Sequence, residues 1–73
     1  MTNNIYSEDY KKFITKLKEA RIKAGFTQKQ VAEKLAKPQS YVSKSESGER
    51  RLDVTELKKF AELYNKSINY FIK

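Results

Sequence analysis

The sequence predicts an all-α domain, a compact bundle of five short helices, and three observations support this. Apolar residues recur at helical spacing, glycine and capping residues divide the chain into short segments, and no stretch shows the alternation of a β-strand. A chain of 73 residues forms one domain of marginal stability, since it buries only about 60% of its unfolded surface. It contains no cysteine for disulfides and no histidine for metal binding, so helix packing and capping must stabilise it.

The N-terminal part of the chain divides into an arm and a first helix. Residues 1–6 are polar and aperiodic, and we expect a flexible arm there, with the domain occupying residues 7–73. Ser7 is the expected N-cap of the helix, which Gly25 ends because glycine accepts a left-handed backbone. The residues that recur at helical spacing along it are Tyr10, Phe13, Ile14, Leu17, Ala20, Arg21 and Ala24.

Two further helices are expected in the middle of the chain. Thr27 opens the first of them, and Gln30 follows at the spacing of a capping box. Pro38 is expected to begin the next helix, at a position where its fixed φ is suitable. That helix is predicted over about 39–47, and Gly48 ends it.

The C-terminal part of the chain predicts the last two helices. Asp53 caps a fourth helix, with Glu56 completing a second capping box, and Ser67 begins a final short helix. The apolar stripe of the fourth helix is Leu57, Phe60, Ala61 and Tyr64. The final helix carries an apolar cluster of Ile68, Tyr70, Phe71 and Ile72. This cluster is richer than one helix needs, so we expect it to close the core and to supply a contact between two copies.

The charge of the chain narrows the class of partner. Sixteen Lys and Arg against nine Asp and Glu give a net charge of +7, which favours a polyanionic partner. Nucleic acid is the first candidate and an anionic membrane the second. Membrane-surface peptides are single amphipathic helices, and the repeated caps argue against that class. No residue pattern indicates catalysis, a metal or a cofactor, so we expect a non-enzymatic, cytoplasmic protein that does not associate with membranes.

The segment from Gln28 to Ser47 carries the functional prediction. Two short helices joined by a tight turn leave the second helix standing out from the domain, where it fits the major groove of double-stranded DNA. Its outward face is polar and contains Gln39, Ser40, Ser43 and Lys44. Glutamine pairs with adenine, lysine donates to guanine, and serine tolerates several bases, so these side chains are the expected base-reading residues.

The ordered set of motifs resembles the Cro/phage-repressor family of helix-turn-helix regulators, often called the XRE family. The residues that carry the resemblance are Arg21, Gly25 to Gln28, Val31, Ala32, Leu35, Tyr41 to Lys44, Glu46, Gly48 and the helix from Val54 to Tyr64. The resemblance implies a lambda-repressor-like fold and sequence-specific DNA binding, most simply as a repressor. It also implies a homodimer, at least on DNA, and a palindromic operator.

The resemblance also assigns roles to single residues. Arg21 and Glu46 match an ion pair that ties the first helix to the recognition helix. The residues at positions that touch the DNA backbone are Gln28, Tyr41, Ser47, Arg50 and Arg51. Tyr41 is adjacent to the inward-facing Val42, and we therefore expect its side chain to point outward.

Two positions depart from the family pattern. Ala36 occupies the turn position where glycine is usual, and a left-handed conformation there costs roughly 1 kcal/mol. Ser45 replaces a large apolar residue, which either weakens the anchoring of the recognition helix or leaves a surface that another chain covers. As an alternative function, the chain is the DNA-binding or interaction module of an antitoxin or of a longer regulator.

Overall fold

The structure, a computed structural model, describes residues 7–72. Five helices follow one another along this part of the chain, and it contains no strand. They are α1 (Glu8–Lys23), α2 (Gln28–Leu35), α3 (Gln39–Ser47), α4 (Val54–Leu63) and α5 (Ile68–Ile72). The predicted all-α bundle of five short helices is confirmed. The arm predicted for residues 1–6 lies outside the described residues.

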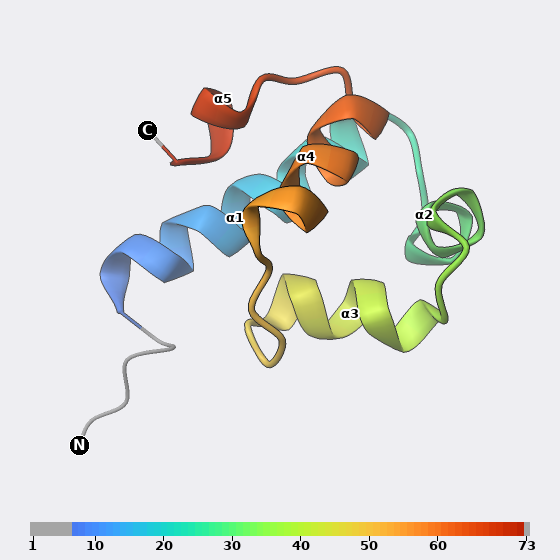
Figure 1. Cartoon of the computed structure of the whole chain (residues 1–73), viewed down its shortest axis with the longest axis horizontal. Coiled ribbons are helices and arrows are strands. Elements are labelled where there is room, and N and C mark those ends of the chain that lie inside the picture. The colour runs from blue at the N-terminus through green and yellow to red at the C-terminus, as the bar shows by residue number, and fades with distance from the viewer. Residues whose placement is uncertain (1–6, 73) are drawn as a thin grey trace.

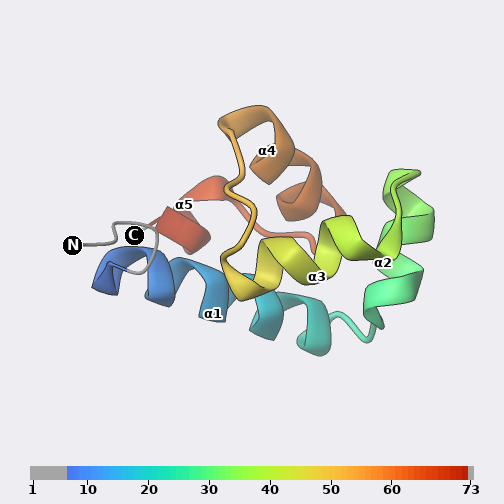
Figure 2. The same cartoon turned by 90° about the horizontal axis from the view of Figure 1, so that it is seen from below.

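The helices pack so that α3 borders the molecule on one side. In Figure 1, α3 forms the lower edge, whereas α5 lies at the opposite edge and packs against α1 and α4. The view from below in Figure 2 shows α3 on the near side, flanked by α2 and α1, which both contact it. Within residues 7–72, no helix has the length and apolar character that crossing a membrane requires.

The core between the helices is apolar and draws on all five of them. Its buried members are Leu17, Ala20, Val31, Ala32, Val42, Leu57, Phe60, Ala61, Tyr64 and Phe71. Phe13 and Phe26 are partly buried and pack against it. Because α3 contributes Val42 to this core, its opposite face is left toward solvent.

The helix starts follow the predicted capping chemistry. Both capping boxes are present: Thr27 with Gln30 at α2, and Asp53 with Glu56 at α4. The helix predicted over about 39–47 is confirmed as α3, although Pro38 precedes its first residue rather than occupying it. Pro38 is the N-cap residue, with an extended ψ of 154°, and α3 begins at Gln39. Its ring fixes φ at −64°, which an N-cap residue accepts equally well.

The turn between α2 and α3 has the left-handed geometry expected for a glycine. Ala36 has φ 57° and ψ 45°, and its N–H donates to Glu33 O at 3.2 Å. The next residue, Lys37, donates to Ala32 O at 2.9 Å, so both N–H groups satisfy carbonyls at the end of α2. This geometry turns the chain sharply into α3 at the expense of strain at the alanine Cβ.

Candidate nucleic-acid interface

The two faces of α3 differ sharply in burial. The residues on the outer face are exposed or partly exposed, namely Gln39, Ser40, Ser43 and Lys44. The inner face buries Val42, Ser45 and Glu46. Residues 39, 40, 43 and 44 share a face because positions three and four apart along a helix are neighbours on its surface. The structure therefore brings all four predicted base-reading residues together on the exposed side of α3.

The polar groups on this face differ in how far they are already bonded. Ser43 Oγ donates to Ser40 O at 3.3 Å, and Ser47 Oγ donates to Lys44 O at 3.2 Å. Within residues 7–72, the side chains of Gln39 and Lys44 make no hydrogen bond or ion pair. Gln39 and Lys44 thus present unengaged donors to the solvent. The hydroxyls of Ser43 and Ser47 already donate to carbonyls, so they offer chiefly acceptor lone pairs.

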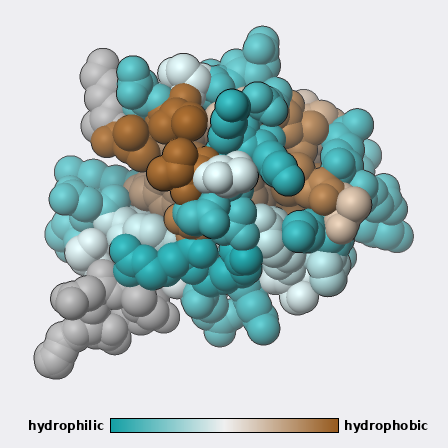
Figure 3. Space-filling model, viewed as in Figure 1, coloured by the Kyte–Doolittle hydropathy of each residue, from teal (hydrophilic) through white to brown (hydrophobic). Residues whose placement is uncertain are grey.

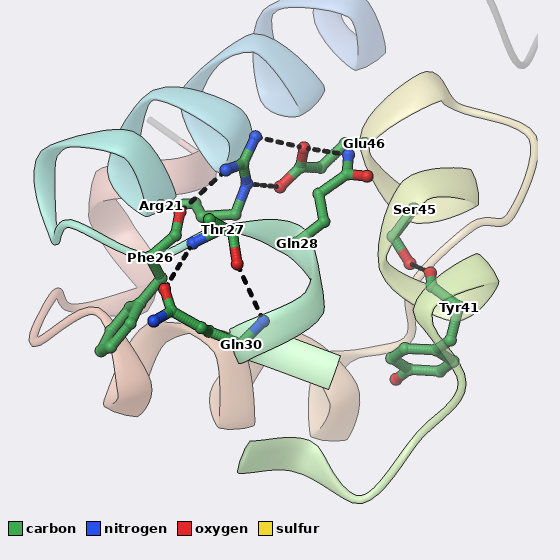
Figure 4. A network of polar contacts seen from close by, with 8 residues as sticks. All are labelled: Arg21, Phe26, Thr27, Gln28, Gln30, Tyr41, Ser45 and Glu46. Atoms are coloured by element: carbon green, nitrogen blue, oxygen red, sulfur yellow. Dashed lines mark hydrogen bonds and ion pairs between the residues drawn. The ribbon is translucent and has the colours of Figure 1, made fainter. Parts of the chain in front are cut away.

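A polar network behind this face joins three helices (Figure 4). Arg21 Nε donates to Glu46 Oε2 at 2.7 Å, and its Nη2 donates to Oε1 at 3.2 Å. Arg21 Nη1 also donates to Phe26 O at 2.8 Å, and Gln28 Nε2 donates to Glu46 Oε1 at 3.0 Å. One carboxylate therefore receives donors from α1 and α2 while belonging to α3.

The network places Gln28 differently from a side chain that projects freely toward a phosphate. Its amide nitrogen is occupied by Glu46, and the side chain is only partly exposed. Gln28 is also the first residue of α2, where backbone N–H groups lack intrahelical acceptors. Gln28 therefore brings two donors to the surface, its second side-chain amide hydrogen and its own backbone N–H.

Tyr41 requires a correction, because its ring does not simply point outward. The ring is partly buried and stacks on Phe60, with centroids 6.0 Å apart and planes 2° from parallel. The guanidinium carbon of Arg50 lies 4.4 Å from the ring centroid, and Lys37 Nζ lies 5.3 Å from it. Burial, together with the charge of Glu56, raises the pKa of the Tyr41 hydroxyl. The ring lies against the core rather than in solvent, because Phe60 beneath α3 offers it a flat apolar partner.

The burial of Ser45 decides between the two consequences expected of this second departure from the family pattern. Its side chain is completely inaccessible, and Oγ donates to Tyr41 O at 2.7 Å, one turn back along α3. The hydroxyl is therefore satisfied within its own helix. This burial excludes the alternative in which Ser45 leaves a surface for another chain to cover.

The two arginines after α3 have different surroundings, although the sequence assigned them the same role. Arg50 forms two bonds to Glu56, from Nη2 to Oε2 at 2.6 Å and from Nη1 to Oε1 at 3.1 Å. Arg51 is exposed, and its guanidinium carbon lies 4.4 Å from the ring centroid of Tyr10. The sequence reading missed Glu56 as a partner of Arg50. The sequence identified Glu56 only as part of a capping box. Arg50 and Glu56 lie six residues apart across a loop, and such a spacing follows no helical periodicity that would indicate a contact.

Comparison with known proteins identifies the fold family. The family model described as Helix-turn-helix matches residues 17–71, which is most of the chain. The chain belongs to the helix-turn-helix family. The resemblance to the XRE type and the lambda-repressor-like fold are thereby confirmed.

One characterised relative of this helix-turn-helix chain is the HTH-type transcriptional regulator ImmR of Bacillus subtilis (strain 168). The two sequences are 46% identical over 57 residues, which is 78% of this chain and 45% of ImmR. The chain therefore spans less than half the length of this relative. No solved structure matches it.

Proposed function

We propose that this chain binds double-stranded DNA sequence-specifically and represses transcription, with α3 in the major groove. The observation that carries the proposal is the division of α3 into an anchored face and a polar face whose Gln39 and Lys44 side chains are unengaged. Membership of the helix-turn-helix family and the regulator name of the relative support it. The net charge of +7 favours a polyanionic partner.

The exposed face of α3 and its flanks receive different tasks in this proposal. Gln39, Ser40, Ser43 and Lys44 read base edges, because they share the face that would lie against the groove. Gln28, Ser47 and Arg51 contact phosphates at the ends of α2 and α3. Phosphate contacts fix the register of the protein on the duplex, and base contacts give it sequence preference.

We further propose that two copies bind a palindromic operator, with half-sites about 34 Å apart. Apolar surface gathers over α5 in Figure 3, where Ile72 is 62% exposed and Ile68 and Tyr70 are partly exposed. This surface offers an apolar contact for a second copy. Footprinting should show symmetric protection, and an asymmetric half-site bound at full affinity by a monomer would argue against the dimer.

The proposed function is tested by comparing a base-reading variant with a phosphate-contact variant. The operator is first selected from a random duplex pool, and each variant is then titrated with salt on operator and scrambled DNA. Gln39→Ala should weaken operator binding by about 1–3 kcal/mol, relax preference at one or two base pairs and leave the salt slope unchanged. Arg51→Ala should weaken both DNAs alike and flatten the slope by about one unit. Equal loss on both DNAs for Gln39→Ala would remove α3 as the reading helix.

A further inference from the structure

The loop between α3 and α4, residues 48–53, is tied to both helices in the free protein. Gly48 turns the chain with φ 90°, and the backbone N–H of Arg50 donates to Lys44 O at 3.1 Å. On the other side, Asp53 N donates to Glu56 Oε1 at 3.0 Å as part of the α4 capping box. The loop is therefore bonded to a backbone carbonyl of α3 through the Arg50 N–H and to a side chain of α4 through the Asp53 N–H.

The Arg50 side chain adds a third tie that reaches both helices at once. Its guanidinium makes a two-bond pair with Glu56 on α4 and lies over the ring of Tyr41 on α3. Tyr41 in turn stacks on Phe60, which is completely buried. Because a guanidinium is planar, it pairs in its plane with a carboxylate while its face packs on an aromatic ring. Arg50 uses both modes here.

These contacts distinguish Arg50 from the phosphate-contacting residues. Glu56 already takes the two-bond position at the terminal nitrogens, at 2.6 and 3.1 Å, so a phosphate could pair with Arg50 in that geometry only by displacing the carboxylate. Arg51, one residue on, is exposed and within residues 7–72 donates no hydrogen bond or ion pair from its side chain. Both guanidinium groups lie over a tyrosine ring, but only that of Arg50 is also bonded to a carboxylate.

We infer that Arg50, held by Glu56 and Tyr41, is a positioning residue that presets the loop after α3 so that Ser47 and Arg51 meet the DNA backbone. This inference rests on the proposed DNA-binding function. A preset loop loses less conformational freedom on binding, so that more of the contact energy remains as affinity. Glu56, although an acid in a protein that binds a polyanion, then assists DNA binding.

The sign of one substitution tests this role. Glu56→Gln removes the charged partner of Arg50 but keeps the capping box, since glutamine also serves at that position. Simple electrostatics predicts tighter DNA binding when an acid is lost, whereas the positioning role predicts binding that is weaker by about threefold to tenfold. Glu49→Gln is the matched control. It removes a charge from the same loop, at a side chain without an ion pair within residues 7–72, and should leave affinity equal or slightly higher.

Substitutions of Arg50 itself separate positioning from phosphate contact. Arg50→Lys keeps the charge but not the two-bond geometry, and it should weaken binding as much as Arg50→Gln does. If Arg50 contacts a phosphate, Arg50→Lys should instead retain most of the affinity, and Glu56→Gln should bind as tightly as wild type or tighter. That pair of results would overturn the inference.

Hydrogen exchange in the free protein makes the inference independent of DNA. The Arg50 amide, bonded to Lys44 O, should exchange about tenfold faster in Glu56→Gln than in wild type, while amides of the α1 core stay protected. Unchanged exchange at this amide would refute positioning even if DNA binding proved real. Faster exchange without sequence-specific DNA binding would refute the proposed function and leave the loop tie established.

Discussion

Two arginine–glutamate pairs hold this small domain together, and they differ in burial and reach. Arg21 and Glu46 have side chains that are 11% and 3% exposed and join residues far apart in sequence. Arg50 and Glu56 are 37% and 23% exposed and span a single loop. The shortest N–O distance is 2.7 Å in the Arg21–Glu46 pair, here called the inner pair, and 2.6 Å in the Arg50–Glu56 pair, the outer pair.

The comparison shows that similar distances do not imply similar energetic roles. Breaking a buried pair leaves an uncompensated charge in a poorly hydrated site, which costs several kcal/mol. Water and salt screen a partly exposed pair, so its loss costs about 1 kcal/mol or less. The inner pair therefore controls whether the helices assemble, and the outer pair controls how one loop is presented.

The largest expected effect is at the inner pair. Arg21→Met should lower the free energy of unfolding by about 3–5 kcal/mol, because Glu46 is left buried with Gln28 as its remaining side-chain partner. In a domain of this size such a loss approaches the whole stability. Urea denaturation followed by circular dichroism measures it. A melting temperature within a degree or two of wild type would mean that the two pairs are energetically alike.

The acid response of the outer pair is expected to be smaller. The Arg50 guanidinium, with the backbone N–H of Asp53, lowers the Glu56 pKa from 4.5 to about 2. Between these values the unfolded chain takes up a proton that the folded chain does not, so stability is lost as pH falls through this window. Solvent screening at Arg50 limits the loss to about 1 kcal/mol.

This acid response is read as a difference between variants. Wild type should lose about 1 kcal/mol more than Glu56→Gln between pH 5 and pH 2.5, measured by urea midpoints at both pH values. Glu49→Gln, the control in the same loop, should follow wild type. An equal loss in all three proteins would show that the outer pair adds nothing to stability.

The two pairs should also differ in how far salt weakens their contribution to stability, and this difference is expected to be smaller still. The stability difference between wild type and Glu56→Gln should shrink by about half between low salt and 1 M NaCl, since the Debye length falls to about 3 Å. The difference between wild type and Arg21→Met should persist, because solvent ions reach the inner pair poorly. Unfolding curves at two salt concentrations give both numbers, and parallel shrinkage would erase the distinction drawn from burial.

The smallest effect is expected at the turn between the two regions. Ala36→Gly removes the strain of a left-handed alanine but adds unfolded-chain entropy, leaving a net gain of a few tenths of a kcal/mol. Asn65, with φ 60° after α4, is the matched control, because asparagine tolerates this conformation. Asn65→Gly should therefore gain less than Ala36→Gly. A clear loss at Ala36→Gly would mean that the turn needs the alanine side chain.

The local features of the fold were predictable from the sequence because their causes are local. Helix periodicity, the two capping boxes and the glycine at the end of α3 act within one or two turns of chain. The outward set on α3 followed from the same spacing rule, and the family resemblance supplied the Arg21–Glu46 partnership, which residue spacing alone does not reveal.

The tertiary structure decided how single side chains are engaged. The sequence treated Arg50 and Arg51 as equivalent, whereas folding brings Glu56 and Tyr41 to the first and leaves the second exposed. It likewise turned the Tyr41 ring onto Phe60, because α4 places a flat apolar surface beneath α3. Such contacts depend on the packing of helices across loops, where residue spacing carries no periodic signal, and so only the folded chain determines them.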